Sequence, residues 1–300
     1  MAFDRALTVS DGMVRSMVSI GRLVGRDEAA GLAEPDPAAR RRARARAVHA
    51  SLALGGGTLS EGQVAALAWG RAVAGPDPDA LGGENVCRAY AALLGLAPHS
   101  AEDLLWAHGT ITGRPVVETP EGVSDLLSWV GHTTAHPLVA ACVAHCEILC
   151  TLPFAEGDGA LARLWQAAVL CRWSGVFTYL PVESEVWGRE EGYRRALGVA
   201  GATGDAVPFV AFMLDAIGAS LSRAVAGRDP APLDREGPRA LQGRLLALFR
   251  DRPDLSLAQA ARALGATVRQ VERCASRLKA EGRLRRVGPR HGGGHWETLP

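Results

Sequence analysis

The stretch Thr151-Leu-Pro-Phe-Ala-Glu-Gly-Asp-Gly-Ala-Leu-Ala-Arg163 decides what fold the whole chain is expected to have. A Pro-Phe turn leads into an acidic Gly-Asp-Gly loop, and a helical pattern begins directly after it. The first N–H groups of a helix have no acceptor within the helix and point into the preceding loop. The stretch therefore predicts a cradle for an anion at the start of a helix.

The same stretch resembles the active-site motif of the Fic (Fido) family, which reads His-Pro-Phe-x-Asp/Glu-Gly-Asn-Gly-Arg-x-x-Arg. Further segments resemble parts of Fic proteins in the same order, so the resemblance covers nearly the whole chain. They are 51–60, 63–67, 70–73, 136–145, 164–170, 180–184, 192–197 and 209–214. The resemblance implies a mainly α protein, a Fic-type helical domain with an N-terminal helical extension. It also implies transfer of AMP from ATP to a protein hydroxyl, with Mg²⁺ at the phosphates.

Carried over position by position, the motif assigns a role to most residues of the stretch. The cradle for phosphate or another ligand comprises Pro153, Phe154, Gly157, Asp158, Gly159 and Arg163. Glu156 matches the metal-binding acid. Leu152, however, stands where the family has its catalytic His, and Ala160 stands where it has the first Arg. Asp158 replaces an Asn. Because an alkyl side chain cannot accept a proton, and losing a positioned base costs roughly 10²–10⁴-fold in rate, we assign no catalytic residue.

Two departures outside the loop point the same way. Ser51, Gly55 and Gly57 match an autoinhibitory motif in which a Glu normally occupies position 55 and bridges the second Arg of the active site. Gly55 cannot do so. The segment 108–119 occupies the place of the family's target-docking flap and looks short for that task. Together these changes predict that ordinary AMP transfer is not the function.

Alternatives remain for the polar residues around the loop. Glu156 and Asp158 place two acids in one turn, and their oxygens suit Mg²⁺ or Ca²⁺. We favour the alternative that Asp158 caps the following helix and that Glu156 is solvated beside its positive end. His108 and His132, near the shortened flap, are candidates for a substitute base, although surface or helix-end histidines are commoner.

Two other patterns have a simple structural interpretation. Cys142, Cys146 and Cys150 form one stripe of a helix, but thiols spread over ~12 Å cannot all reach one metal ion, so we expect core residues. The run Arg40-Arg-Arg-Ala-Arg-Ala-Arg46 is either a phosphate-binding arm or a solvated helix face, and we favour the latter.

The composition indicates the cellular compartment of the protein, and the distribution of charge separates two parts of the chain. The sequence has 300 residues, 48% of them hydrophobic, and a net charge of +1. It contains no apolar run of about 20 residues and no signal-peptide pattern, so we expect a cytoplasmic protein with reduced cysteines. Residues 236–300 hold 13 Arg or Lys against 6 Asp or Glu, a net of +7, whereas the remainder holds 20 against 26, a net of −6. A basic C-terminal module therefore follows an acidic body.

Helical periodicity continues through the body, and the C-terminal pattern is that of a winged helix-turn-helix. In the body we expect helices over 14–24, 40–54, 84–94, 101–108, 121–131, 137–150, 160–175, 185–200 and 207–225. A further helix is expected to start within 58–62 and to carry its apolar face over 64–73. In the module we expect helices over 239–250, 257–264 (capped by Ser256) and 268–281, and strands over 283–287 and 295–298. The predicted domains are 1–95 (N-terminal helical region), 96–226 (Fic core), 227–238 (linker) and 239–300 (winged helix-turn-helix).

The module carries basic side chains in the places that contact DNA in such folds. They are Arg269, Gln270, Arg273 and Arg277 on the third helix, and Arg285, Arg286 and Arg290 on the wing. A helix of this kind fits the major groove, and winged helices usually bind paired half-sites as dimers. The alternative is a module that packs on a partner or on a second copy.

The leading hypothesis is a degenerate Fic-fold protein that binds DNA and acts as a binding or regulatory protein, with no certain cofactor. A second hypothesis is a repurposed enzyme that acts on a small molecule in the same pocket. A third is residual nucleotide transfer, in which Mg²⁺ and ATP still bind the cradle.

Overall fold

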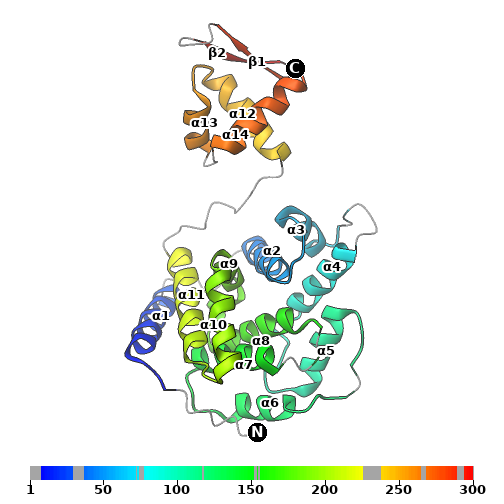
Figure 1. The fold of residues 1–300 in the computed structure, drawn as a ribbon, viewed down its shortest axis with the longest axis vertical. Helices are drawn as coiled ribbons and strands as arrows, with labels where there is room; N and C mark the ends of the chain where they lie inside the picture. Colours follow the sequence, from blue (N-terminus) through cyan, green and yellow to red (C-terminus); the bar gives the residue numbers. More distant parts are fainter. Residues whose placement is uncertain are drawn as a thin grey trace. The chain divides into compact units, whose positions relative to one another are not determined.

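The computed structural model describes residues 8–29, 37–71, 73, 78–116, 118–151, 154, 156–225, 238–264, 268–288 and 294–299. The chain forms two compact units, Met1–Asp229 and Pro230–Pro300. The fold is mainly α with a small β wing, as the sequence predicts (Figure 1).

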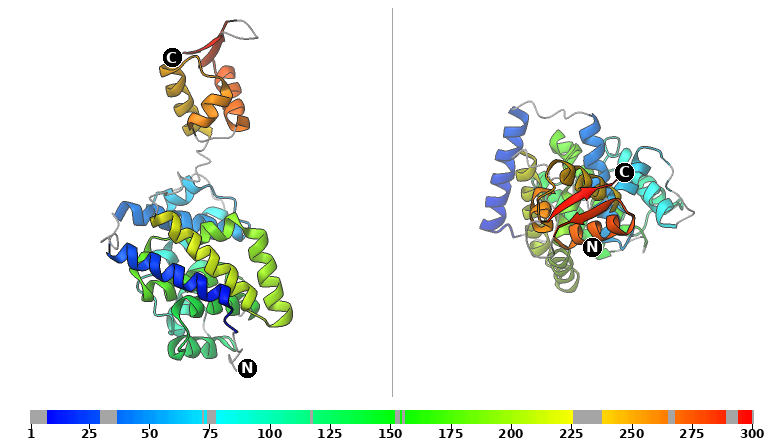
Figure 2. Two further views of the ribbon diagram at one scale, coloured as in Figure 1. Left: turned by 90° about the vertical axis from the view of Figure 1, so that its left-hand side faces the viewer. Right: turned by 90° about the horizontal axis from the view of Figure 1, so that it is seen from above.

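The larger unit is helical throughout its described part. Its elements are α1 (Asp11–Ala29), α2 (Pro37–Leu54), α3 (Glu61–Ala68), α4 (Pro78–Ala91), α5 (Ala101–Thr112), α6 (Val123–His132), α7 (Pro137–Thr151), α8 (Asp158–Trp173), the 3-10 helix η1 (Gly175–Thr178), α9 (Val182–Gly188), α10 (Glu190–Thr203) and α11 (Val207–Val225). The helices α7 and α8 pair closely at its centre, and α1 lies along α11 on the outside (Figure 2).

Several predicted helix boundaries are wrong. The helix α4 begins at Pro78 rather than at 84, and α1 spans Asp11–Ala29 rather than 14–24. Three further differences have a local reason. The single helix expected over 185–200 is two helices, because α9 ends at Gly188 and Arg189 has a non-helical backbone between it and α10. The helix expected to end at 108 continues to Thr112 and stops at Gly113, which adopts the left-handed conformation. The helix predicted through residue 73 ends at Ala68, since Gly70 takes a positive φ.

The core of the larger unit has two adjoining parts that meet at α7 and α8. One lies among α1, α7, α9, α10 and α11, and the other among α2, α4, α5 and α8. Trp165 on α8 is fully buried, and its indole N–H donates to the carbonyl of Pro98 at 3.1 Å. Cys142 and Cys146 are also buried, which confirms that they are core residues. Their helix therefore fixes the position of the loop that follows it.

One core helix also has the composition of a membrane span. Within α11, the window Val207–Ala224 is long and apolar enough to cross a bilayer by length and composition alone. Phe209, Val210 and Leu214 of this helix are buried among the neighbouring helices. Packing within the unit thus accounts for its apolar character.

The described part of the smaller unit contains three helices and a hairpin. Its elements are α12 (Pro238–Asp251), α13 (Leu257–Leu264), α14 (Val268–Ala280), β1 (Leu284–Val287) and β2 (His295–Thr298). The strands are antiparallel, with Leu284 opposite Thr298 and Val287 opposite His295. Ser256 accepts a hydrogen bond from Gln259 N–H at 3.2 Å, which confirms it as the cap of α13. The unit has its own apolar core.

Candidate functional site

The predicted cradle lies at the start of α8. Gly157 is the N-cap residue with φ +77°, and its carbonyl accepts from Leu161 N–H at 3.0 Å. Leu152 and Pro153 lie outside the described residues. Asp158 is the first residue of the helix rather than its cap, so the capping role favoured for it is wrong. The turn into the helix needs a left-handed residue, which glycine supplies, and Asp158 is instead buried at the positive end of α8.

Glu156 is the most exposed acid of the loop. Its carboxylate forms an ion pair with Arg114 at 3.1 Å, and the two side chains are 69% and 76% exposed. Within the described part of the chain, no three His, Cys, Asp or Glu side chains are grouped closely enough to hold a metal ion. Arg114 follows α5 in the shortened flap, and sequence reasoning missed it as a neighbour of the loop, because the two positions are 42 residues apart.

His108 of α5 contacts two residues of the loop, Phe154 and Glu156. Its Nε2 donates to the carbonyl oxygen of Glu156 at 2.8 Å, and its ring stacks on Phe154 with centroids 3.9 Å apart. Because the side chain is buried and Nε2 is engaged with the backbone, His108 holds the loop in place. His132 is exposed on α6 and its Nδ1 donates to the carbonyl of Ser128. These contacts give both histidines structural roles.

Arg163, the second Arg of the motif, is buried and bonded to α2. Its Nε donates to the Ser51 hydroxyl at 2.8 Å, and its Nη2 donates to the Ser51 carbonyl at 2.9 Å. A Cβ on Gly159 would lie 3.3 Å from Nη2 of Arg163, so a residue without a side chain leaves room for the guanidinium. The predicted motif residues Ser51 and Arg163, 112 positions apart, are thus brought together.

The C-terminal end of α2 supplies the negative partner that Gly55 cannot. The last carbonyls of a helix carry partial negative charge. Arg163 binds the carbonyl of Ser51, and Arg194 of α10 binds the carbonyl of Leu54 at 3.1 Å. Gly55 and Gly57 both donate their N–H groups to the carbonyl of Leu52 at 2.9 Å and so form the turn that ends the helix. Carbonyl oxygens at the end of α2 therefore take the place of a glutamate as the partners of two guanidinium groups.

A buried carboxyl completes the surroundings of Arg163. The hydroxyl of Tyr90 on α4 donates to Glu183 of α9 at 2.9 Å. Burial raises the pKa of Glu183 above its ordinary value, while the hydrogen bond from Tyr90 and the positive charge of Arg163 act in the opposite direction. Sequence reasoning missed Tyr90 and Glu183, because no local pattern marks two residues 93 positions apart as partners.

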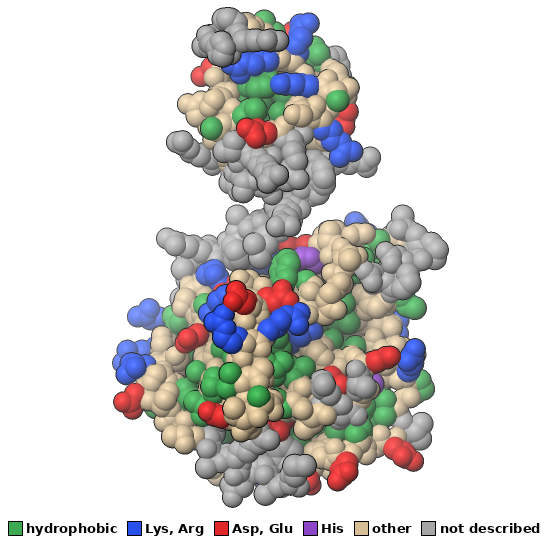
Figure 3. Space-filling view, in the orientation of Figure 1, with side chains coloured by type: hydrophobic (Ala, Val, Ile, Leu, Met, Phe, Trp, Pro, Cys, Tyr) green, Lys and Arg blue, Asp and Glu red, His purple; other side chains and the backbone are tan. Residues whose placement is uncertain are grey.

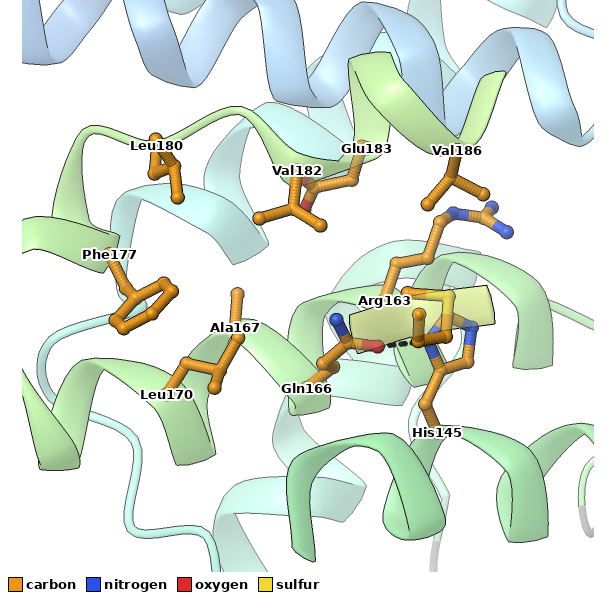
Figure 4. A pocket seen from close by; sticks show the side chains of 11 residues that line it. His145, Arg163, Gln166, Ala167, Leu170, Phe177, Leu180, Val182, Glu183 and Val186 are labelled. Atoms are coloured by element: carbon orange, nitrogen blue, oxygen red, sulfur yellow. Dashed lines mark hydrogen bonds between the residues drawn. The ribbon is translucent and has the colours of Figure 1, made fainter. Parts of the chain in front are cut away.

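A small cavity adjoins Arg163 and Glu183, between α8 and α9 (Figure 4). His145, Arg163, Gln166 and Glu183 line one end, and apolar side chains line the other, among them Leu170, Phe177, Leu180 and Met213. The cavity measures about 20 Å³, room for about one water molecule. His145 bonds to Gln166 and, at 3.0 Å, to the hydroxyl of Tyr193. Burial lowers its pKa to about 3, so the imidazole is neutral at physiological pH.

The structure describes the side chains of three of the seven residues predicted to contact DNA. Arg290 and the side chains of Arg269, Gln270 and Arg273 lie outside what the structure describes. The exposed Arg277 pairs with Glu281 at 3.3 Å, and Arg285 donates through Nε to Glu297 at 3.0 Å. Arg286 lies over the ring of Trp296, 5.2 Å from its centroid. These three basic side chains are on the surface of the smaller unit.

The chain is similar to solved structures of Fic proteins. It is 30% identical to a Fic family protein from Desulfovibrio desulfuricans G20, with 97% of each chain covered and a TM-score of 0.68. It shares its fold with Fic-1 (residues 134–508) from C. elegans, at 23% identity, 71% coverage of each chain and a TM-score of 0.55. A Fic domain containing signaling protein from Bacteroides thetaiotaomicron is 18% identical, with 70% of this chain and 99% of that one covered and a TM-score of 0.52. No family model and no curated protein matches the chain.

Proposed function

Because the chain belongs to the Fic family, we propose that it is a degenerate member that no longer transfers AMP and acts as a DNA-binding regulatory protein. The observation that carries the first part is the state of Arg163. The guanidinium that would hold phosphates is buried and bonded twice to Ser51 of α2. A cation engaged in this way has two donors fewer for a nucleotide.

Three sequence changes support the same conclusion. Leu152 occupies the position of the general base, and Asp158 places a negative charge at the helix N-terminus where a phosphate would bind. Ala160 removes a further cation. Each change weakens either proton abstraction or the attraction of a phosphate, and none compensates another.

DNA binding is inferred from the charge and order of elements in the smaller unit. Residues 236–300 carry a net charge of +7, and their helices and hairpin follow the order of a winged helix. In that arrangement α14 would lie in the major groove, and Arg285 and Arg286 would contact backbone phosphates. We propose a cytoplasmic homodimer that binds paired half-sites and takes a partner or small ligand in its larger unit.

Thermal unfolding of the full chain with ATP and Mg²⁺ tests the loss of nucleotide binding. A nucleotide present at 100 times its Kd adds about 2.7 kcal/mol to stability, which for a unit of this size raises Tm by about 5–10 °C. We expect no shift with ATP, with Mg²⁺ or with both. A shift that requires both would overturn this part of the proposal and favour residual transfer. Transfer would then leave labelled AMP on protein in a reaction that Arg163→Ala abolishes and Leu152→His barely changes.

Salt-dependent binding to duplex DNA tests the second part. The change Arg269→Gln with Arg273→Gln removes two predicted phosphate or base contacts, so the slope of log K against log salt concentration should fall by about 2. The matched control changes Arg88 and Arg195, two exposed arginines of the larger unit, to Gln. If the natural chain, the Arg269 and Arg273 variant and the Arg88 and Arg195 control all show the same slope, α14 is excluded as the DNA-contacting helix.

A second candidate function is an enzyme repurposed for a small molecule, and it would require the cavity, which has room for about one water molecule, to widen. The chemistry of its lining supports this candidate, because a polar end with Arg163 and Glu183 adjoins an apolar end with Phe177 and Leu180. Ala167 lines the same cavity. A compound that raises Tm of the natural chain, but not of the Ala167→Phe variant, would favour this function over the regulatory one.

A further inference from the structure

The larger unit carries a basic surface that neither the cradle nor the C-terminal unit uses. Segment 37–73 holds six Arg (Arg40, Arg41, Arg42, Arg44, Arg46 and Arg71) against a single acid, Glu61, a net of +5. The other residues of 1–235 hold 14 Arg against 25 acids, a net of −11. Positive charge on this acidic unit is therefore concentrated in one short segment. We call Arg40, Arg41, Arg42, Trp69 and Arg71 the basic corner.

An exposed tryptophan in the basic corner contacts two of its arginines. Trp69 follows the last turn of α3 and is 48% exposed, which is unusual for so large an apolar side chain. The guanidinium carbon of Arg41, on α2, lies 5.3 Å from the centroid of its ring, and that of Arg71 lies 5.7 Å away. Two arginines from separate segments thus converge on one indole at the surface.

Within the described part of the chain, these arginines have no acidic partner. Among the described residues, none of Arg40, Arg41, Arg42 and Arg71 forms an ion pair. Glu61, the acid of the segment, stands at the opposite end of α3 from Trp69. Elsewhere on the unit the pattern differs, because Glu190 pairs with Arg194 and Glu191 with Arg195 where acidic and basic side chains intermix over α9 and α10 (Figure 3).

We propose that the basic corner binds a single strand of nucleic acid. The phosphates would pair with the arginine side chains, and an unpaired base would stack on Trp69 or on a guanidinium plane seated against its ring. Arginines with an exposed aromatic side chain are the combination that binds single strands with little sequence preference. Contact with Trp69 orients each guanidinium while its outer N–H groups remain in water to bind phosphate. This site is separate from the duplex contact proposed for α14.

Anisotropy titration of a labelled 12-residue oligothymidylate with the full chain, over a range of salt concentrations, tests the proposal. Changing Arg41 and Arg71 to Gln removes two phosphate contacts, so the slope of log K against log salt should fall by about 1.4. Trp69→Ala should weaken binding about 5-fold to 150-fold through loss of stacking. Trp69→Phe keeps an aromatic ring and should retain most of the affinity.

Three controls separate the basic corner from general charge and from the C-terminal unit. Trp106 is 44% exposed, so Trp106→Ala matches the loss of an exposed indole. The pair Arg88→Gln and Arg195→Gln matches the loss of charge. Both should leave oligothymidylate binding unchanged. The variant with Arg269→Gln and Arg273→Gln should lose duplex affinity and keep the single-strand affinity.

The results that overturn the proposal are equally definite. Absence of oligothymidylate binding by the natural chain would overturn it, as would equal affinity of the natural chain and the Trp69→Ala variant with unchanged urea midpoints. If the α14 variant loses single-strand binding while Trp69→Ala does not, the site belongs to the C-terminal unit. If the natural chain does not bind duplex DNA but Trp69→Ala weakens oligothymidylate binding, the single-strand site at the basic corner is supported and the duplex contact proposed for α14 is contradicted.

Discussion

Arg163 is a cation inside the larger unit, and its removal should lower the stability of the fold as well as alter a ligand site. Arg163→Met leaves the Ser51 carbonyl and the buried Glu183 without their positive neighbour. Removing one partner from such buried groups costs about 3–5 kcal/mol. Urea unfolding should show that loss, whereas Arg195→Met, at an exposed ion pair, should change stability by less than about 1 kcal/mol. Equal stability of the two variants would mean that Arg163 is free to serve a ligand.

His145 predicts the acid sensitivity of the same unit. Its pKa is near 6.5 in the unfolded chain and about 3 in the fold, because burial disfavours the imidazolium. Between these values the unfolded state binds a proton that the folded state does not, so stability falls as pH falls from 6.5 towards 3. His145→Gln should flatten this dependence by up to about 1.4 kcal/mol per pH unit. The measurement is the free energy of unfolding at a series of pH values.

The comparison for His145 is the exposed His132. The control variant His132→Gln removes an exposed imidazole at the surface of α6, where Nδ1 donates to the carbonyl of Ser128. A natural chain whose stability does not change between pH 6.5 and 4.5 would contradict the burial of a neutral imidazole. Unlike His145, Glu183 has a raised pKa, so its contribution to stability is lost as pH rises.

At the scale of an element, the start of α8 depends on glycine for two reasons. Gly157 has φ +77°, and a Cβ there would lie 2.8 Å from Cγ2 of Thr112. Gly122, the N-cap of α6, has φ +83° but open space around the Cβ position. Gly122→Ala should therefore cost about 1–2 kcal/mol for the backbone alone, and Gly157→Ala about 1–3 kcal/mol more for the overlap. Chemical denaturation of both variants measures the difference.

If Gly157→Ala lowers the free energy of unfolding no more than Gly122→Ala does, then Thr112 on α5 moves to make room for the added methyl group. The loop would then be held by His108 and Phe154 rather than by close packing on Thr112. In either case the cradle is built by two elements together, since α5 lies directly under the first turn of α8.

At the scale of the whole molecule, the two units have separate cores and should unfold separately. Phe249 is buried in the smaller unit, where it stacks on Trp296 with centroids 5.0 Å apart. Phe249→Ala should cost about 3–5 kcal/mol and lower the Tm of the smaller unit only. Leu164, fully buried on α8, is the matching site in the larger unit, where Leu164→Ala should cost about 2–5 kcal/mol. Calorimetry that shows one transition shifted by either change would mean that the units unfold as one.

Local features of the molecule follow from local sequence. The cap at Ser256, the hairpin of β1 and β2 and the burial of Cys142 and Cys146 agree with prediction. Each depends on neighbours within a few positions, through capping, turn formation or helical periodicity. The split between α9 and α10 escaped prediction, because the apolar pattern continues across Arg189 while the backbone does not.

The sequence by itself determined the Fic fold, the helical order and the absence of a His at position 152. Only the tertiary structure decided what Arg163, Glu183, His108 and Arg114 do. Arg163 donates a hydrogen bond to Ser51, which is 112 positions away in the sequence, and Tyr90 donates one to Glu183, which is 93 positions away. Such contacts depend on how helices pack, and periodicity states which face of a helix is buried but not which side chain it meets. Buried polar groups must then bond to whatever partner the packing brings within reach.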